Sequence, residues 1–101
     1  MSTTKDYKDY ILEQINILNG ITCKPMMGEY LLYYNEILFG GIYDNRLLVK
    51  KVSTNKKYKM KESIPYQGAK AMYLVDDIDN SNILKKIILD TCKLFKIKKN
   101  K

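Results

Sequence analysis

The sequence predicts an α+β fold of two layers, with an antiparallel β-meander of four or five strands packed against an N-terminal and a C-terminal helix. Near both ends of the chain, apolar residues recur every three to four positions, which is the spacing of one helix face. Between these segments, short apolar runs are separated by two-residue polar breaks, as in successive β-hairpins. A chain of 101 residues has the size of one domain. We expect a core at 4–95 and a basic tail at 96–101.

The first helix is expected over residues 4–19. Thr3 and Asp6 have the spacing of an N-terminal capping box, and Gly20 is a natural stop. One face of this helix carries the residues at helical spacing: Tyr7, Tyr10, Ile11, Gln14, Ile15 and Leu18.

A turn at residues 25–28 is expected to lead into a three-stranded meander. Asn35-Glu36 and Asp44-Asn45 separate its strands, and Asn and Asp tolerate the left-handed backbone of tight hairpin turns. Gly40 and Gly41 each remove a side chain from the middle strand, which favours a bulge or the close approach of another group. The strands are placed at 29–34, 37–43 and 46–51.

The rest of the chain is expected to return to the helix layer. Residues 52–63 are lysine-rich and weakly helical, residues 65–68 form a turn, and residues 71–75 form a further strand. Three aspartates then precede a helix at 80–95 and suit its N-terminal dipole: Asp76, Asp77 and Asp79. The apolar stripe of this helix consists of Ile83, Leu84, Ile87, Ile88, Thr91, Leu94 and Phe95.

Composition argues against catalysis, cofactors and metals. The chain has no histidine, and its two cysteines, Cys23 and Cys92, lack a CxxC spacing, so no transition-metal set and no base for a cysteine nucleophile is available. We expect free thiols, no cofactor and no enzyme activity. For Asp44 and Arg46, a contact that stabilises their turn is favoured over a catalytic role. The N-terminus lacks the apolar region of a secretory signal, and no apolar run is long enough to span a bilayer, so we expect no membrane partner.

The net charge of +7 is concentrated in the second half of the chain. Residues 1–49 hold four basic and six acidic side chains, whereas residues 50–101 hold fourteen lysines and five acids. One stretch has six lysines without an acid and encloses Tyr58: Lys50, Lys51, Lys56, Lys57, Lys59 and Lys61. Lysines neutralise phosphates and a tyrosine ring stacks on a base, so this stretch is a candidate nucleic-acid contact. The alternative is a solvated connector enriched in lysine by A/T-rich codons.

The strands are apolar on both alternating faces, although one face of an antiparallel sheet normally meets water. Tyrosine suits a half-exposed interface because it combines an apolar body with a polar tip. One interpretation is a protein interface or homodimer on the second face; the other is internal cover by residues 52–63 and 80–95. The candidate interface residues are Tyr30, Tyr33, Tyr34, Tyr43 and Tyr73.

Four short motifs occur in an order that resembles the N-terminal domain of the TfoX/Sxy family, over about residues 4–95. They are Lys24-Pro25-Met26-Met27-Gly28, Tyr33-Tyr34, Asp44-Asn45-Arg46-Leu47 and Ile64-Pro65-Tyr66-Gln67-Gly68. The positions that carry the resemblance are Met26, Gly28, Tyr34, Asp44, Arg46, Leu47, Pro65, Tyr66 and Gly68. Lys24 stands where the family often has arginine, and Met27 where it often has phenylalanine.

The resemblance implies a two-layer α+β fold similar in outline to secretion chaperones, and a bacterial cytoplasmic location. The best-known family members regulate competence genes for DNA uptake and carry a second, C-terminal domain, for which this chain has no room. We therefore expect a stand-alone, non-enzymatic regulatory module that acts through protein contacts. The alternative is direct nucleic-acid binding by residues 50–61 and the C-terminal tail.

Overall fold

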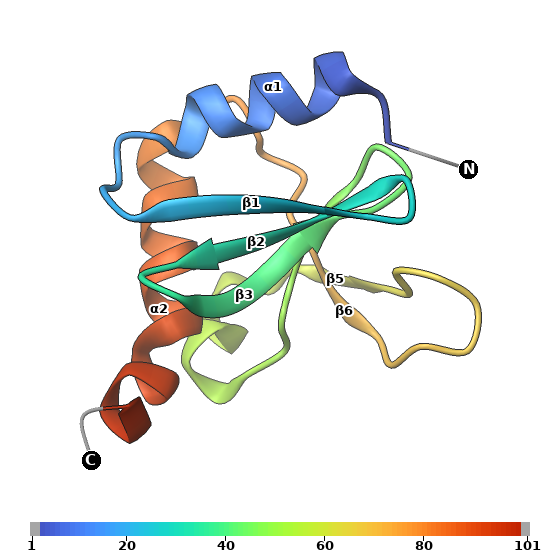
Figure 1. Cartoon of the computed structure of the whole chain (residues 1–101). Coiled ribbons are helices and arrows are strands. Elements are labelled where there is room, and N and C mark those ends of the chain that lie inside the picture. Colours follow the sequence, from blue (N-terminus) through green and yellow to red (C-terminus); the bar gives the residue numbers. More distant parts are fainter. Residues whose placement is uncertain (1–2, 100–101) are drawn as a thin grey trace.

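A six-stranded antiparallel sheet packs against a layer of helices (Figure 1). The computed structural model describes the backbone of residues 3–99 and the side chains of residues 3–93. The strand order across the sheet is β1-β2-β3-β4-β6-β5, so the predicted α+β outline is confirmed. The elements are α1 (Lys5–Ile15), β1 (Ile21–Met26), β2 (Glu29–Tyr34), β3 (Ile37–Ile42), β4 (Leu47–Val49), the 3-10 helix η1 (Ser53–Tyr58), β5 (Lys61–Ser63), β6 (Met72–Leu74) and α2 (Ser81–Lys99).

Three two-residue turns connect β1 to β4. Both central residues of the two predicted turns, Asn35-Glu36 and Asp44-Asn45, have positive φ, and so do Met27 and Gly28. Turns of this kind match the right-handed twist of the strands they join. The local turn chemistry therefore sets the register of the meander.

The strand β1 was not predicted, because Pro25 was read as part of a turn. Gly20 O accepts a hydrogen bond from Asn35 N, so the hydrogen-bonded pairs of the β1–β2 ladder fall at every second residue from that point. Pro25, which pairs with Tyr30, is therefore at a non-bonded position. At the outer edge of a sheet, such a position loses nothing from the missing N–H.

The segment 52–63 is not the weak helix that we expected throughout. Residues Ser53–Tyr58 form a 3-10 helix, but Lys61–Ser63 form the edge strand β5, which pairs with β6. The strand β4 covers only Leu47–Val49 and lies between β3 and β6. The sheet thus continues past the meander.

The helix ends also differ from the predicted ones. The side chain of Thr4, not Thr3, caps α1 by accepting from Tyr7 N, and the helix ends at Ile15. Asn80 caps α2 by accepting from Ile83 N, so the preceding aspartates are not the caps. The backbone of α2 continues to Lys99, where we expected a frayed tail. The side chains of 94–99 and all of residues 100–101 lie outside the described part.

The hydrophobic core lies between the helix layer and one face of the sheet. Ile11 and Ile15 of α1 and Leu84 and Ile88 of α2 are buried there. Thr91 completes the buried stripe of α2. The sheet contributes Leu32, Phe39, Ile42, Leu47, Val49 and Tyr73. Within residues 3–99, no helix is both long and apolar enough to cross a membrane.

Candidate binding groove on the open face of the sheet

The second apolar face of the sheet points away from both helices. Leu47 and Val49 belong to the core cluster, whereas Leu48 between them points to the opposite face. The 3-10 helix η1 packs against α2 through hydrogen bonds from Thr54 and Asn55, so it also lies on the helix side. The 3-10 helix η1 and the helix α2 therefore cover the core face of the sheet and not the second apolar face.

The five tyrosines of the predicted interface do not share a face. Tyr30, Tyr34 and Tyr73 pack against the core on the helix side. Tyr33, which alternates with Tyr34, faces outward, and the ammonium group of Lys24 lies 5.1 Å from its ring centroid. Tyr43 also lies on the outer face. Successive side chains of a strand point to opposite faces of the sheet, so the sequence alone predicts that Tyr33 and Tyr34 lie on different faces.

Arg46 attaches the loop between β5 and β6 to the outer end of the meander. Its guanidinium donates to the carbonyl oxygens of Ile64 at 3.1 Å and Pro65 at 3.3 Å. It also donates to Ser63 Oγ and to the carbonyl oxygen of Tyr43. The structure gives no ion pair between Asp44 and Arg46, although both are described, so the favoured contact across the turn is replaced by this attachment. Pro65 is buried as a result.

An open groove of about 560 Å³ lies between this loop and the outer face of the sheet. Leu38 and Met72 of the sheet are half-buried in it, and Pro65 and Tyr66 of the loop form one side. We call this cavity the loop groove. All of its lining residues are Leu38, Gly40, Tyr43, Lys50, Lys51, Val52, Pro65, Tyr66, Ala69, Lys70, Ala71 and Met72.

The ring of Tyr43 lies directly over Gly41. A Cβ atom added at Gly41 would lie 2.8 Å from Tyr43 Cε2 and 2.6 Å from the carbonyl oxygen of Tyr30, so only glycine allows this approach. The ring centroid of Tyr66 is 6.1 Å from that of Tyr43, with the two planes inclined at 55°. Burial raises the pKa of Tyr43, while the side chain of Tyr66 is 59% exposed. The groove thus has a fixed aromatic side and a projecting one.

A second hollow, of about 430 Å³, lies on the other side of Tyr66. Glu29, Asp44 and Arg46 line it together with the residues 64–67 of the loop. Glu29 Oε1 accepts from Asp44 N at 3.0 Å and from Thr3 Oγ1 at 2.7 Å. This carboxylate therefore holds the N-terminal segment and the β3–β4 turn in place.

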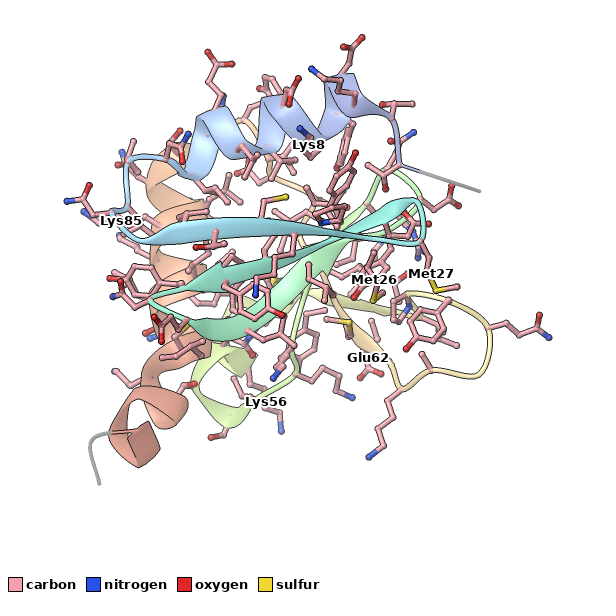
Figure 2. All side chains as sticks on the ribbon, viewed as in Figure 1. Lys8, Met26, Met27, Lys56, Glu62 and Lys85 are labelled. Carbon is pink, nitrogen blue, oxygen red and sulfur yellow. The ribbon has the colours of Figure 1, made fainter. Side chains whose placement is uncertain are left out.

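The six lysines of the predicted nucleic-acid contact do not form one continuous patch. Lys51 pairs with Glu62 at 3.1 Å, and Lys57 with Asp90 at 3.1 Å. Lys59 and Lys61 line a hollow that is also lined by two acidic residues, Asp76 and Asp77. Lys56 is exposed and lines a shallow hollow together with Lys51, and Lys50 lines the loop groove. In Figure 2, the labelled Lys56 lies below the sheet, and Glu62 lies between it and the loop.

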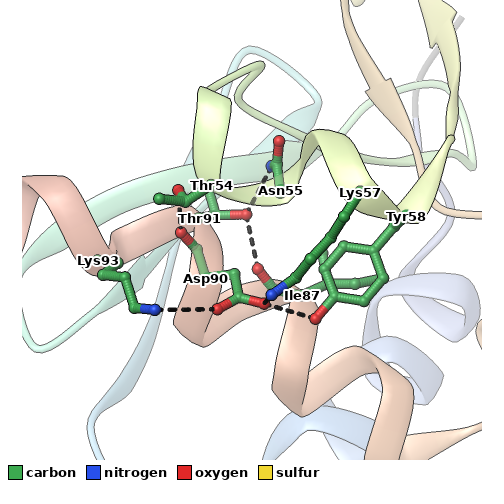
Figure 3. A network of polar contacts seen from close by, with 8 residues as sticks. All are labelled: Thr54, Asn55, Lys57, Tyr58, Ile87, Asp90, Thr91 and Lys93. Carbon is green, nitrogen blue, oxygen red and sulfur yellow. Dashed lines mark hydrogen bonds and ion pairs between the residues drawn. The ribbon is translucent and has the colours of Figure 1, made fainter.

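Tyr58, the ring inside the lysine stretch, is held against α2 (Figure 3). Its hydroxyl donates to Asp90 Oδ2 at 2.5 Å. Burial and this hydrogen bond raise the pKa of Tyr58 to about 12. For Asp90, burial acts to raise the pKa, but the hydrogen bond from Tyr58 and the charge of Lys57 outweigh it and lower the pKa. The Tyr58 side chain therefore stabilises the contact between η1 and α2, and its ring is not positioned to stack on a nucleic-acid base.

The positions that carry the family resemblance lie in two places. Gly28, with φ of +86°, forms the β1–β2 turn after Met26, and Figure 2 shows Met26 and Met27 at that end of the sheet. Tyr34 and Leu47 face the core. The positions at the loop groove and the second hollow are Asp44, Arg46, Pro65 and Tyr66. Gly68, with φ of +89°, is the turn of the same loop.

The thiols and carboxylates of the described residues form neither a disulfide nor a metal-binding group. Cys23 and Cys92 are free, and burial raises the pKa of Cys92 to about 11. Among residues 3–93, no group of three cysteine, aspartate and glutamate side chains is close enough to hold a metal ion. What sequence reasoning missed is the loop groove itself, whose signal was the lone arginine after a hairpin turn, together with a downstream Pro-Tyr.

Comparison with known proteins gives one informative relative. No protein-family model matches the chain, and no solved structure matches it. The chain is 31% identical over 80 residues to a protein of Spirochaeta aurantia named "uncharacterized 12.7 kDa protein in trpE 5′ region". The match covers 77% of this chain and 70% of that protein. The chain therefore belongs to the same family as this uncharacterized spirochaete protein.

Proposed function

We propose that the protein is a small, non-enzymatic interaction module that binds a protein partner in the loop groove. The observation that carries this proposal is the position of the groove on the face of the sheet opposite to both helices. Leu38 and Met72 supply apolar surface there, and Tyr66 projects beside them with 59% of its side chain exposed. Tyrosine side chains that are half free in this way supply large contact areas at low entropic cost.

The edges of the sheet are less suited to binding than this face. At one edge, Pro25 has no N–H to donate, and at the other, β5 has only three residues. Short edges and edge prolines prevent the addition of further strands. These features of the edges favour the open face of the sheet, and not a sheet edge, as the binding site for a protein partner.

The resemblance to the N-terminal domain of the TfoX/Sxy family supports a regulatory role for this module. Four of the positions that carry it, Asp44, Arg46, Pro65 and Tyr66, build or line the two hollows at the loop. A regulator that acts through contacts needs a shaped surface and no catalytic groups, and this surface has that character. We therefore propose a regulatory interaction module of the TfoX/Sxy competence-regulator type.

Site-specific photo-crosslinking in living cells tests the proposal. Tyr66 and, in a matched control, Tyr10 on α1 are each replaced by the photo-crosslinking amino acid benzoylphenylalanine; both side chains are exposed, at 59% and 36%. We expect a discrete protein adduct from position 66 and none from position 10. An adduct of twice the chain mass would identify the partner as a second copy. Equal adducts from both positions, no adduct, or an adduct with nucleic acid at position 66 would contradict the proposal.

A further inference from the structure

The loop groove has a one-sided charge. Three lysines line it, Lys50, Lys51 and Lys70, and no acidic residue does. The ammonium group of Lys51 is turned away from the groove, toward Glu62 and the ring of Tyr73. Lys70 is exposed and takes part in no ion pair with any residue that the structure describes. A groove that is apolar between its walls and positive along its rim attracts negative groups, because complementary charge guides association and suppresses unsuitable partners.

The second hollow restricts where negative groups of a partner would lie. Glu29 and Asp44 line it, and its one cation, Arg46, donates to four oxygen atoms of the protein. Tyr66 lines both cavities and so separates them. An acidic segment would be repelled beyond Tyr66 and attracted on the groove side of it.

We infer that the partner of the loop groove is a protein segment that carries aspartate or glutamate next to an apolar anchor residue. The anchor lies against Tyr43 and Tyr66, and its acidic neighbours lie against Lys70. This inference rests on the proposed function, since it names the chemistry of the partner at the same groove. It differs from the nucleic-acid hypothesis, in which the negative groups are phosphates and lie along residues 50–61 and the C-terminal tail.

Lys51 supplies a control on the other face of the sheet. Its ammonium group is engaged by Glu62 at 3.1 Å and lies 5.9 Å from the ring centroid of Tyr73, which packs on the helix side. Replacing Glu62→Gln leaves the shape of the side chain but removes a charge outside the groove. The affinity for a groove partner should therefore stay within about twofold.

The experiment is a selection of peptides from a random displayed library on the intact protein. We expect enriched sequences that combine an aromatic or aliphatic residue with adjacent acids. For a synthetic peptide of the strongest enriched sequence, we expect Lys70→Glu to weaken binding by roughly two- to fivefold and Glu62→Gln to leave it nearly unchanged. Lys24→Glu reverses a charge on the same sheet face but outside the groove, and it should leave the affinity within about twofold.

Each result bears on one of the two proposals. Peptides that lose binding on Met72→Glu but carry basic or neutral residues would overturn the acidic partner and leave the groove as a binding site. No enriched peptide, or peptides indifferent to Met72→Glu, would overturn the proposed function itself. Displacement of the peptide by single-stranded DNA, with binding lost in the triple variant Lys56→Glu, Lys59→Glu, Lys61→Glu, would favour the nucleic-acid reading and overturn this one.

Discussion

The side-chain amide of Asn55 donates a hydrogen bond to the hydroxyl oxygen of Thr91 at 2.8 Å, and neither residue is exposed. The same amide donates to the carbonyl oxygen of Lys50 at 2.8 Å, and Thr91 Oγ1 donates to the carbonyl oxygen of Ile87. These bonds satisfy the buried polar groups that join η1 to α2 (Figure 3). A buried polar group that loses its hydrogen-bond partner destabilises the fold by its full desolvation energy.

The variant Asn55→Ala should therefore lower the free energy of unfolding by roughly 1–3 kcal/mol, since the carbonyl of Lys50 and the hydroxyl of Thr91 lose a donor. Urea unfolding monitored by circular dichroism measures this. Ser53→Ala, at an exposed position of the same 3-10 helix, is the matched control and should change stability by less than about 0.5 kcal/mol. Equal effects of the two substitutions would contradict the role of the bond.

The stability of the protein should fall in acid partly through Asp90. Its folded-state pKa is lowered, so its contribution is fully present above the unfolded value of about 3.9 and is lost as the pH falls through the folded value. Urea unfolding at a series of pH values between about 6 and 2 measures the dependence. Asp90→Asn should be less stable at neutral pH and lose less stability on acidification. Asp77→Asn, at an exposed position, should follow the wild type.

Gly41 and Gly68 are required for different reasons, close packing at Gly41 and a left-handed backbone at Gly68. A Cβ atom at Gly41 would meet the carbonyl oxygen of Tyr30 at 2.6 Å, whereas at Gly68 it meets nothing within 4 Å but requires a residue with φ of +89°. Gly41→Ala should cost more than about 2 kcal/mol of unfolding free energy through overpacking. Gly68→Ala should cost about 1 kcal/mol through backbone strain. Thermal unfolding of both variants compares the two losses of stability. A larger loss for Gly68→Ala than for Gly41→Ala would contradict the tight packing of the Tyr43 ring over Gly41.

Arg46→Lys should loosen the loop without unfolding the sheet. A lysine ammonium group cannot reproduce the fork of donors that reaches the carbonyl oxygens of Ile64 and Pro65. We expect chymotrypsin to cleave after Tyr66 several times faster than in the wild type, while the circular dichroism spectrum stays unchanged. Lys70→Arg, on the same loop, is the control for a change of cation. Unchanged cleavage in Arg46→Lys would remove Arg46 as the attachment of the loop.

The two cysteines should differ in their reaction with a disulfide reagent at pH 8. Burial raises the pKa of Cys92 to about 11 and raises that of Cys23 as well, but Cys23 is half-buried whereas Cys92 is 2% exposed. The thiolate is the reacting form, so Cys23→Ser should leave a protein that reacts slowly. Cys92→Ser should keep the faster phase. Equal rates for the two single-cysteine proteins would place Cys92 in contact with solvent.

The hairpins could be predicted from the sequence because their determinants are local. Asn35-Glu36 and Asp44-Asn45 adopt the left-handed backbone that their residue types allow. The strand β1 was missed because Pro25 is a strong turn signal, and only its place at the edge of a sheet makes it compatible with a strand. That place depends on which strands pair, which no short stretch of sequence contains.

The candidate site was only partly predictable for a related reason. Alternation separates Tyr33 from Tyr34, but the residues do not say which face the helices cover. The loop groove depends on contacts of Arg46 with carbonyl oxygens 18 and 19 residues later. Backbone oxygens are present at every position, so a contact of this kind has no sequence signature. The available indications were the lone arginine after a hairpin turn and the Pro-Tyr of the family resemblance.

The place of Pro25 bears on how copies of this protein behave at high concentration. A growing fibril recruits molecules by offering a row of free amide hydrogens, and here that row is interrupted on one border and very short on the other. Purified samples should therefore remain dispersed over long storage unless the first hairpin opens. The substitution Pro25→Val would restore the missing backbone N–H. We expect this variant to precipitate more readily than the wild type during storage.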